Sequence, residues 1–331
     1  MRITLLFLLS FVLQFIIIQA SRKWAFCVDA GESEKPQRLH TFSTARAGGL
    51  GIFFSTLIPF SLLGDNAEAL MLASLPVFAA GFYEDFRTGL SPAKRLLLMS
   101  CGPAAFILLS GDAIVSIGFL ALPFVLAAPF TVFAVVGVAN AMNVIDGVNG
   151  LASGVSIIAL IFLAAISYIY GDQLVLNISV VLIVSIAGFF VWNYPKGKIF
   201  LGDGGAYFIG FLLAETSVLL VDRNSAISPW FPMVLLVYPV FEVFFSIYRR
   251  RIKRRGSAMA ADSFHLHTLI CKRVTKSNSR TSVYLWALVW VFGSAAFIFH
   301  ANTPALVAIV IVFAAVYVFI YRRIIRFNNP F

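Results

Sequence analysis

The stretch from Leu151 to Trp192, LASGVSIIALIFLAAISYIYGDQLVLNISVVLIVSIAGFFVW, decides the fold class. It holds two apolar runs, 151–170 and 174–192, joined by a short polar interruption, and Asp172 is its one charged residue. A helix that crosses the roughly 30 Å hydrocarbon layer of a membrane needs about 20 apolar residues. Each run is long enough, so the stretch predicts two neighbouring transmembrane helices.

The rest of the chain repeats this pattern. Hydrophobic residues make up 60% of the 331 residues and charged residues only 12%, which excludes an ordinary water-soluble domain. Further apolar runs lie at 3–20, 47–63, 67–83, 95–110, 123–142, 205–221, 230–248, 283–300 and 304–321. The run at 3–20 lacks a small-x-small cleavage pattern and is interpreted as a retained span. We expect an all-α, polytopic membrane protein of about 10–11 transmembrane helices, with residues 1–331 forming a single domain.

The positive charges give the orientation. With the N-terminus outside, 23 of the 25 Lys and Arg residues fall on the cytoplasmic side, which leaves only Arg2 and Arg223 outside. Membrane topology therefore explains the net charge of +10 better than nucleic-acid binding does. The segment Gly111–Leu122 is assigned to an outer loop or interfacial piece. The cytoplasmic loops are expected at about 21–46, 84–94, 143–150, 193–204 and 249–282.

Five acidic residues, which took no part in building this topology, fall on the same side. The cytoplasmic span ends and loops contain Glu84, Asp85, Asp146, Asp203 and Asp262. Any one of them is also explained as a solvated helix cap, because a carboxylate at a span end costs little. Five together in short glycine-bearing segments indicate an ionic site on the cytoplasmic face.

Two of these segments flank inner loops. In Gly81–Arg95, the paired acids Glu84 and Asp85 suit a divalent ion or a proton, and Lys94 with Arg95 suits a phosphate. An ordinary helix entry at Ser-Pro is the alternative.

In the segment 140–154, Asn140, Asn143 and Asp146 are spaced by three and share one broad helix face. This arrangement predicts a hard-cation or phosphate site, with an asparagine-capped turn as the alternative.

The other two segments open later helices or loops. Asp203 lies between glycines in Phe200–Tyr207, where it is exposed to a ligand at a helix N-terminus or acts as an N-cap. The basic run 249–255 is typical of an anchor to anionic lipids. After it, His265 and His267 are two residues apart, which is not helical zinc spacing, so hydrogen bonding to a phosphate or sugar is expected. The three cysteines have no metal-like spacing and are expected to be free thiols.

These segments, in this order and preceded by Pro36-Gln-Arg-Leu-His and Ala45-Arg-Ala-Gly-Gly-Leu-Gly, resemble the polyprenyl-phosphate N-acetylhexosamine-1-phosphate transferases, a group within glycosyltransferase family 4. The resemblance implies that a UDP-sugar donates its sugar-1-phosphate to undecaprenyl phosphate and that UMP is released, a phosphotransferase reaction of the EC 2.7.8 type. It implies a multi-pass protein of the bacterial inner membrane whose site faces the cytoplasm, with membrane lipids around it, no nucleic acid, and a homodimer as one option.

The resemblance also implies roles for individual residues. Asp203 and Asn143 match the positions that hold Mg²⁺, with Mn²⁺ as an alternative ion. The matching catalytic positions are Glu84, Asp85 and Asp146, with Asp85 expected to position or deprotonate the acceptor. The matching substrate-binding positions are Asn140, Lys94, Arg95, His265 and His267.

Four positions depart from the family pattern or stand apart from it. Glu84 stands where a first aspartate is usual, and Asn149 stands where many bacterial members have a second one. Thr268 replaces a third histidine, which argues against the peptidoglycan branch and for an initiating enzyme of O-antigen or teichoic-linkage type. Glu242 resembles a family acid and is also explained as a buried structural carboxyl. An ion-coupled transporter and a catalytically impaired scaffold are the alternative functions.

Overall fold

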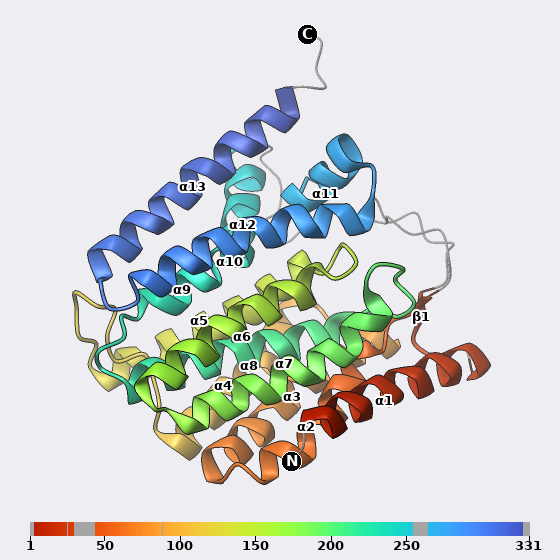
Figure 1. The fold of residues 1–331 in the computed structure, drawn as a ribbon, viewed down its shortest axis with the longest axis horizontal. Coiled ribbons are helices and arrows are strands. Elements are labelled where there is room, and N and C mark those ends of the chain that lie inside the picture. Colours follow the sequence, from red (N-terminus) through yellow and green to blue (C-terminus); the bar gives the residue numbers. More distant parts are fainter. Residues whose placement is uncertain (1–2, 25, 30–43, 88, 254–263, 327–331) are drawn as a thin grey trace.

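The computed structural model describes residues 3–24, 26–29, 44–87, 89–253 and 264–326, and these form a bundle of long helices (Figure 1). In the described part of the chain, nine helices are long and apolar enough to cross a membrane. They are α1 (Ile3–Trp24), α3 (Asp65–Arg87), α4 (Pro92–Ser110), α5 (Phe124–Ile145), α6 (Leu151–Tyr170), α7 (Gln173–Asn193), α8 (Gly202–Arg223), α12 (Asn278–Ile298) and α13 (Thr303–Arg326). The prediction of an all-α, polytopic membrane protein is confirmed.

The polar interruption of the opening stretch ends one helix and begins the next. Gly171 follows α6 in the left-handed region at φ 71°, where a residue without Cβ is favoured. The side chain of Asp172 then caps α7 by accepting the backbone N–H of Val175. Helices α6 and α7 pack against each other, as two spans joined by a short turn must.

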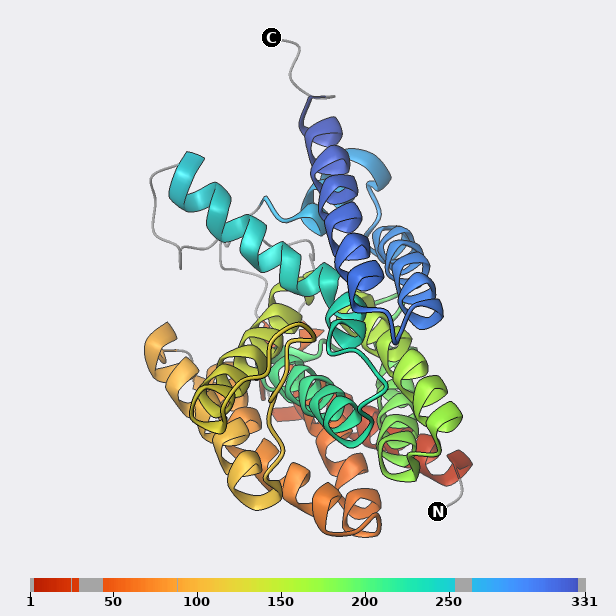
Figure 2. The same cartoon turned by 90° about the vertical axis from the view of Figure 1, so that its left-hand side faces the viewer.

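Two of the eleven apolar runs differ from a simple span. Helix α2 (Gly48–Ser61) has 14 residues, a length of about 21 Å, which is short for a full crossing. The run 230–248 is broken into α9 (Trp230–Leu235) and α10 (Val237–Tyr248). Proline 239 explains the break, because it has no N–H for the carbonyl of Leu235 and its ring crowds that carbonyl. Figure 2 shows α10 leaving the bundle after this break.

The segment Gly111–Leu122 is a loop, as predicted. It joins α4 to α5 and contains a short bridge between Ser116 and Ala121. The remaining elements of the described residues are the strand pair β1 (Val28–Asp29) and β2 (Thr44–Ala45), the short helix α11 (Leu266–Ile270), and the π-helical turns η1 (Arg249–Lys253) and η2 (Cys271–Thr275).

Helix α8 forms the centre of the bundle and is almost completely buried. It contacts α2, α3, α5, α6 and α7, and α12 and α13 lie along one side of the bundle (Figure 1). The first turn of α8 carries Asp203, so the fold places this residue where several helix ends meet.

Candidate active site

Five ionisable side chains from five parts of the chain meet around the first turn of α8. Asp85 comes from the last turn of α3, Asp146 directly follows α5, Arg46 precedes α2, and Arg95 lies in the first turn of α4. Asp203 is at the centre of this group. The sequence predicted that the acids share one side of the membrane, and the fold brings three of them to one place.

The carboxylate of Asp203 has partners on both oxygens. Oδ1 accepts the Asn143 amide at 3.0 Å and the guanidinium of Arg46 at 3.3 Å, while Oδ2 lies 3.7 Å from Nη1 of Arg95. The side chain of Asp203 is 17% exposed, so a ligand can still reach it. Arg95 also lies over the ring of Tyr207 at 5.6 Å, which holds its guanidinium against α8.

Asp85 lies deeper, with a side chain that is 2% exposed. Its two carboxylate oxygens accept the backbone N–H groups of Asp203 and Gly204, each at 2.9 Å. Nη2 of Arg46 is 3.7 Å from Oδ1 of Asp85 and therefore lies between the carboxylates of Asp85 and Asp203. Its positive charge offsets their mutual repulsion.

Asp146 completes the acidic group from the loop after α5. Burial raises the pKa of Asp146 well above its usual range; Arg46 lowers that pKa, whereas the charges of Asp203 and Asp85 raise it further. An uncharged Asp146 is a hydrogen-bond donor, and a cation or proton acceptor nearby would return it to the carboxylate form.

The two histidines lie on a short segment that packs against the Asp146 loop. The rings of His265 and His267 are parallel, with centroids 5.4 Å apart, and Nδ1 of His265 is 3.0 Å from Oε1 of Glu242. A Cβ built on Gly147 would lie 2.8 Å from Nε2 of His267, so glycine is what allows this contact. Burial lowers the pKa of His267 to about 4, so its imidazole is neutral near pH 7.

Glu242 anchors this histidine segment. Its carboxylate is buried and accepts the N–H of Leu266 at 3.1 Å and the hydroxyl of Tyr317 at 2.9 Å, in addition to its contact with His265. The family-like acid at position 242 therefore acts as a structural tie between α10, the histidine segment and α13.

Three residues predicted for the site are not among the side chains around Asp203. Oε2 of Glu84 accepts the N–H groups of Gly89 and Leu90 at 3.4 and 3.2 Å, so this carboxylate stabilises the loop after α3. Lys94 is exposed in the first turn of α4. Asn140 is half-buried one helical turn before Asn143.

Asn149 lies in a tight junction of loops. Its side-chain N–H donates to the carbonyl of Pro195 at 3.0 Å, and its backbone N–H and carbonyl bond to Asn278 and Ser282. An amide can donate here where a carboxylate cannot, which explains why asparagine suits this position. Asp262, Pro36 and the rest of 30–43 and 254–263 lie outside the described residues.

Sequence reasoning missed Arg46 as a site residue. It counted this arginine only as one of the cytoplasmic positive charges, although Ala45-Arg-Ala-Gly-Gly belonged to the quoted family pattern. All three cysteines are free, as predicted.

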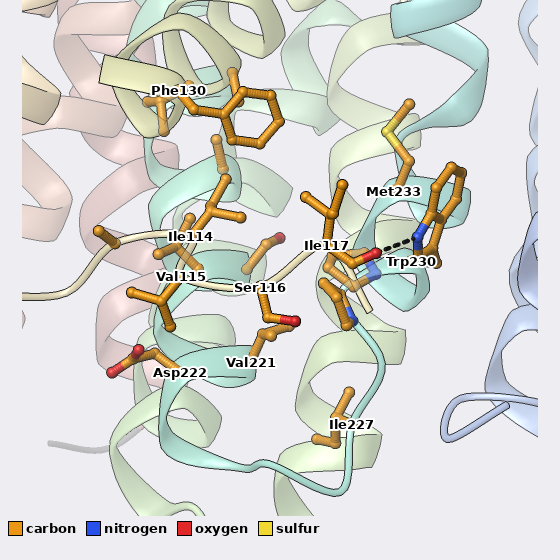
Figure 3. Close-up of a pocket in the computed structure, with 18 of the residues that line it drawn as sticks. Ile114, Val115, Ser116, Ile117, Phe130, Val221, Asp222, Ile227, Trp230 and Met233 are labelled. Carbon is orange, nitrogen blue, oxygen red and sulfur yellow. Dashed lines mark hydrogen bonds between the residues drawn. The ribbon is translucent and has the colours of Figure 1, made fainter. Parts of the chain in front are cut away.

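A cavity of about 560 Å³ lies elsewhere, between the loop 113–117, α5, the last turns of α8 and α9. Its walls are mostly apolar, with Asp222 at one side, and Trp230 donates to the carbonyl of Ile117 at 2.9 Å (Figure 3). It contains none of the site residues predicted from the sequence.

Known proteins match this chain along most of its length. The model of glycosyl transferase family 4 matches residues 68–221, a range that includes Asp85, Arg95, Asn143, Asp146 and Asp203.

A probable undecaprenyl-phosphate N-acetylglucosaminyl 1-phosphate transferase of Bacillus subtilis is 31% identical over 279 residues, which cover 80% of this chain and 76% of the relative. An undecaprenyl-phosphate alpha-N-acetylglucosaminyl 1-phosphate transferase of Thermotoga maritima is 27% identical over 269 residues, covering 81% of each chain. A phospho-N-acetylmuramoyl-pentapeptide-transferase of Staphylococcus carnosus is 28% identical over 252 residues, covering 69% of this chain and 78% of the relative.

Proposed function

Since this chain belongs to glycosyl transferase family 4, we propose that it transfers a sugar-1-phosphate from a UDP-sugar to a polyprenyl phosphate and releases UMP. The observation that carries the proposal is the group of Asp85, Asp146 and Asp203 with Arg46 and Arg95 at one end of a membrane-embedded bundle. A reaction between two phosphate compounds, one of them anchored in lipid, needs such a charged site at a membrane surface.

The group fits a divalent cation that is shared with a diphosphate. Mg²⁺ is usually held by one or two carboxylates, with substrate phosphates and water as its other ligands. Asp203 offers a partly exposed carboxylate and Asn143 an amide oxygen beside it. The remaining ligands of such a cation would come from the substrate phosphates and water.

When bound, Mg²⁺ or Mn²⁺ would neutralise charge on the donor diphosphate. The protein's own contribution is to hold the two anions together. In the proposed reaction an acceptor phosphate oxygen bonds to the β-phosphorus of the UDP-sugar, and the bond from that phosphorus to the oxygen bridging to UMP breaks. The guanidinium groups of Arg46 and Arg95 lie where they can bind phosphate oxygens and stabilise the charge that develops in this exchange.

The histidine segment suits the sugar side of the donor. His267, with its lowered pKa, offers a hydrogen bond without a charge, and it lies against the Asp146 loop. We assign the donor to the UDP-N-acetylhexosamines, with N-acetylglucosamine first because two of the relatives carry that sugar in their names. The product would initiate a cell-surface polysaccharide of the O-antigen or teichoic-linkage kind, with the site on the cytoplasmic side of a bacterial inner membrane.

The test is a donor panel. Purified protein with Mg²⁺ and undecaprenyl phosphate should release UMP from one UDP-N-acetyl sugar, and Asp203→Ala should reduce this release at least about 100-fold, the scale of losing a main electrostatic stabiliser. Asp65→Ala is the matched control, because Asp65 also lies in the first turn of a helix but begins α3, far from the site. UMP release from no donor would overturn the proposal.

A transporter is the alternative that one observation favours. Glu215 is fully buried within the α8 span, and its two carboxylate oxygens have no hydrogen-bond partner among the described residues. Transporters use intramembrane acids and broken helices to couple ions. Ion flux in proteoliposomes without UMP release would favour this alternative, and a folded protein that shows neither would favour a scaffold.

A further inference from the structure

The backbone around Asp203 is held from a neighbouring helix. The first N–H groups of an α-helix have no acceptor within that helix. In α8 the two carboxylate oxygens of Asp85 accept the N–H groups of Asp203 and Gly204, both at 2.9 Å. Asp85 therefore caps the start of α8 from α3.

Glycines bring the two helices close enough for this cap. A Cβ on Gly81 would lie 2.5 Å from the backbone nitrogen of Gly204, and one on Gly202 would lie 2.6 Å from Oδ2 of Asp85. Gly202 also adopts φ +78°, a conformation that L side chains rarely take. The chain thus uses glycine at the positions where a side chain would separate Asp85 from the first turn of α8.

A general base must lie within hydrogen-bonding reach of the proton that it takes. Both oxygens of Asp85 are engaged by N–H groups and its side chain is 2% exposed, whereas the side chain of Asp203 is 17% exposed. Asp85 thus contacts Asp203, whose carboxylate is the more exposed of the two, while the side chain of Asp85 is itself buried.

We propose that Asp85 is a positioning residue: it fixes the backbone of Asp203, and through it the direction of the Asp203 carboxylate, and it does not deprotonate the acceptor. This inference rests on the proposed function, in which Asp203 is a ligand of the divalent cation. The backbone of Asp203 is held by Asp85, and its carboxylate is held by Asn143 and Arg46, so the residue is fixed at both ends. Such fixing matters because a misplaced ligand group loses most of its effect on a reaction.

Two variants separate positioning from proton transfer. Asp85→Asn keeps one acceptor oxygen of similar shape and loses the other, and Asp85→Ala loses both; neither can act as a base. Asp172→Asn is the matched control, because Asp172 caps α7 at the opposite end of the bundle and is also buried.

Three measurements are then compared for all three variants. They are hydrogen exchange of residues 199–208, Mn²⁺ binding in the presence of UDP by electron paramagnetic resonance, and kcat as a function of pH.

We expect a graded response. Relative to wild type, exchange at Asp203 and Gly204 should rise in Asp85→Asn and rise further in Asp85→Ala, and Mn²⁺ binding should weaken in the same order, by roughly 10- to 100-fold for each lost charge-assisted hydrogen bond. Asp85→Asn should keep at least about tenfold more kcat than Asp85→Ala and retain the wild-type pH profile. The Asp172 variant should match wild type in Mn²⁺ binding and in exchange of this segment.

The proposal is overturned if the two Asp85 variants are equally inactive while their exchange and Mn²⁺ binding match wild type, because that pattern belongs to a lost base. Unchanged exchange in Asp85→Ala alone would also overturn it. Exchange does not depend on turnover, so a wild-type protein that releases no UMP would refute the proposed function and leave the test of Asp85 intact.

Discussion

At the scale of single residues, the direction in which a side chain points determines its role as much as its position in the chain does. Glu84 and Asp85 are adjacent, but successive residues of a helix point about 100° apart, and these two serve a loop and a helix N-terminus respectively. The sequence predicted that Asp85, Asn143, Asp146 and Asp203 share one side of the membrane, because all four lie at span ends on that side. It did not predict Arg46, whose partner Asp203 is 157 positions away.

Removing Arg46 should disable the site. Arg46→Ala would leave the carboxylates of Asp85 and Asp203 without the cation between them and remove a phosphate ligand, so kcat/KM for UMP release should fall at least about 100-fold. Arg46→Lys keeps the charge without the planar fork and should give an intermediate loss.

Arg22→Ala, at the exposed end of α1, is the control and should keep wild-type activity. Near-normal activity in Arg46→Ala would show that the arginine only balances charge in the resting protein.

His267 should make the protein sensitive to acid. Its pKa is about 4 in the folded state, below the ordinary value near 6.5, so the unfolded chain binds the extra proton as the pH falls between these values. Stability from this group is complete above about pH 6.5 and is lost progressively toward pH 4, with a loss of about 2 kcal/mol at pH 5.

Chemical unfolding in mixed micelles at pH 7.5 and 5.0 measures this effect. The wild-type free energy of unfolding should fall between pH 7.5 and pH 5.0. In His267→Gln this fall should be smaller by about 2 kcal/mol, because glutamine cannot titrate in this range. An equal pH response in both proteins would contradict the assignment of this sensitivity to His267.

At the scale of elements, hydropathy located the helices but not their breaks or their contacts. It predicted one span at 230–248 because an average over apolar residues does not register a missing N–H, whereas Pro239 ends α9 at Leu235. Helix contacts escaped prediction for a related reason, since glycine lowers hydrophobicity and yet permits the closest packing. Gly49 lies against Gly205, where a Cβ would come within 2.4 Å of the Cα.

The contact of α3 with α8 gives an element-scale prediction. Gly81→Ala places a methyl group 2.5 Å from a backbone nitrogen of α8, which cannot rotate away, so the helices must separate. We expect a loss of about 1–3 kcal/mol in stability and a clear loss of activity.

Gly137→Ala is the control within a helix, because a Cβ there meets nothing within 4 Å. It should be neutral or stabilising by up to about 1 kcal/mol. Equal behaviour of the two variants in thermal unfolding would contradict the close contact.

At the scale of the whole molecule, the two ends of the bundle carry different sets of charged residues. The end with the carboxylates of the site also holds Lys94, Lys196 and Lys198, while the Asp172–Arg223 pair lies at the other end, with 3.0 Å between Oδ2 and Nε. The sequence predicted this arrangement well because the bilayer restricts each helix to two orientations. It gave no information on which helix lies in the centre, since an apolar stretch suits both lipid and protein surroundings.

The orientation can be tested with cysteines in a Cys101→Ala background, which removes the exposed native thiol. A membrane-impermeant maleimide added to intact cells should label Ser225→Cys and leave Lys198→Cys unlabelled, and in inverted vesicles the result should reverse. Both positions are exposed, so access depends on the side of the membrane. Labelling of Lys198→Cys in intact cells would place the carboxylates outside and contradict the proposed cytoplasmic donor.

The central place of α8 has a consequence for how the chain is assembled. In the part of the chain that the structure describes, seven helices precede α8, and α2, α3, α5, α6 and α7 are among its neighbours. During synthesis from the N-terminus these helices enter the bilayer before α8 does. The middle of the molecule is therefore made after its surroundings, and the earlier helices must leave or open a gap through which α8 enters sideways from the lipid.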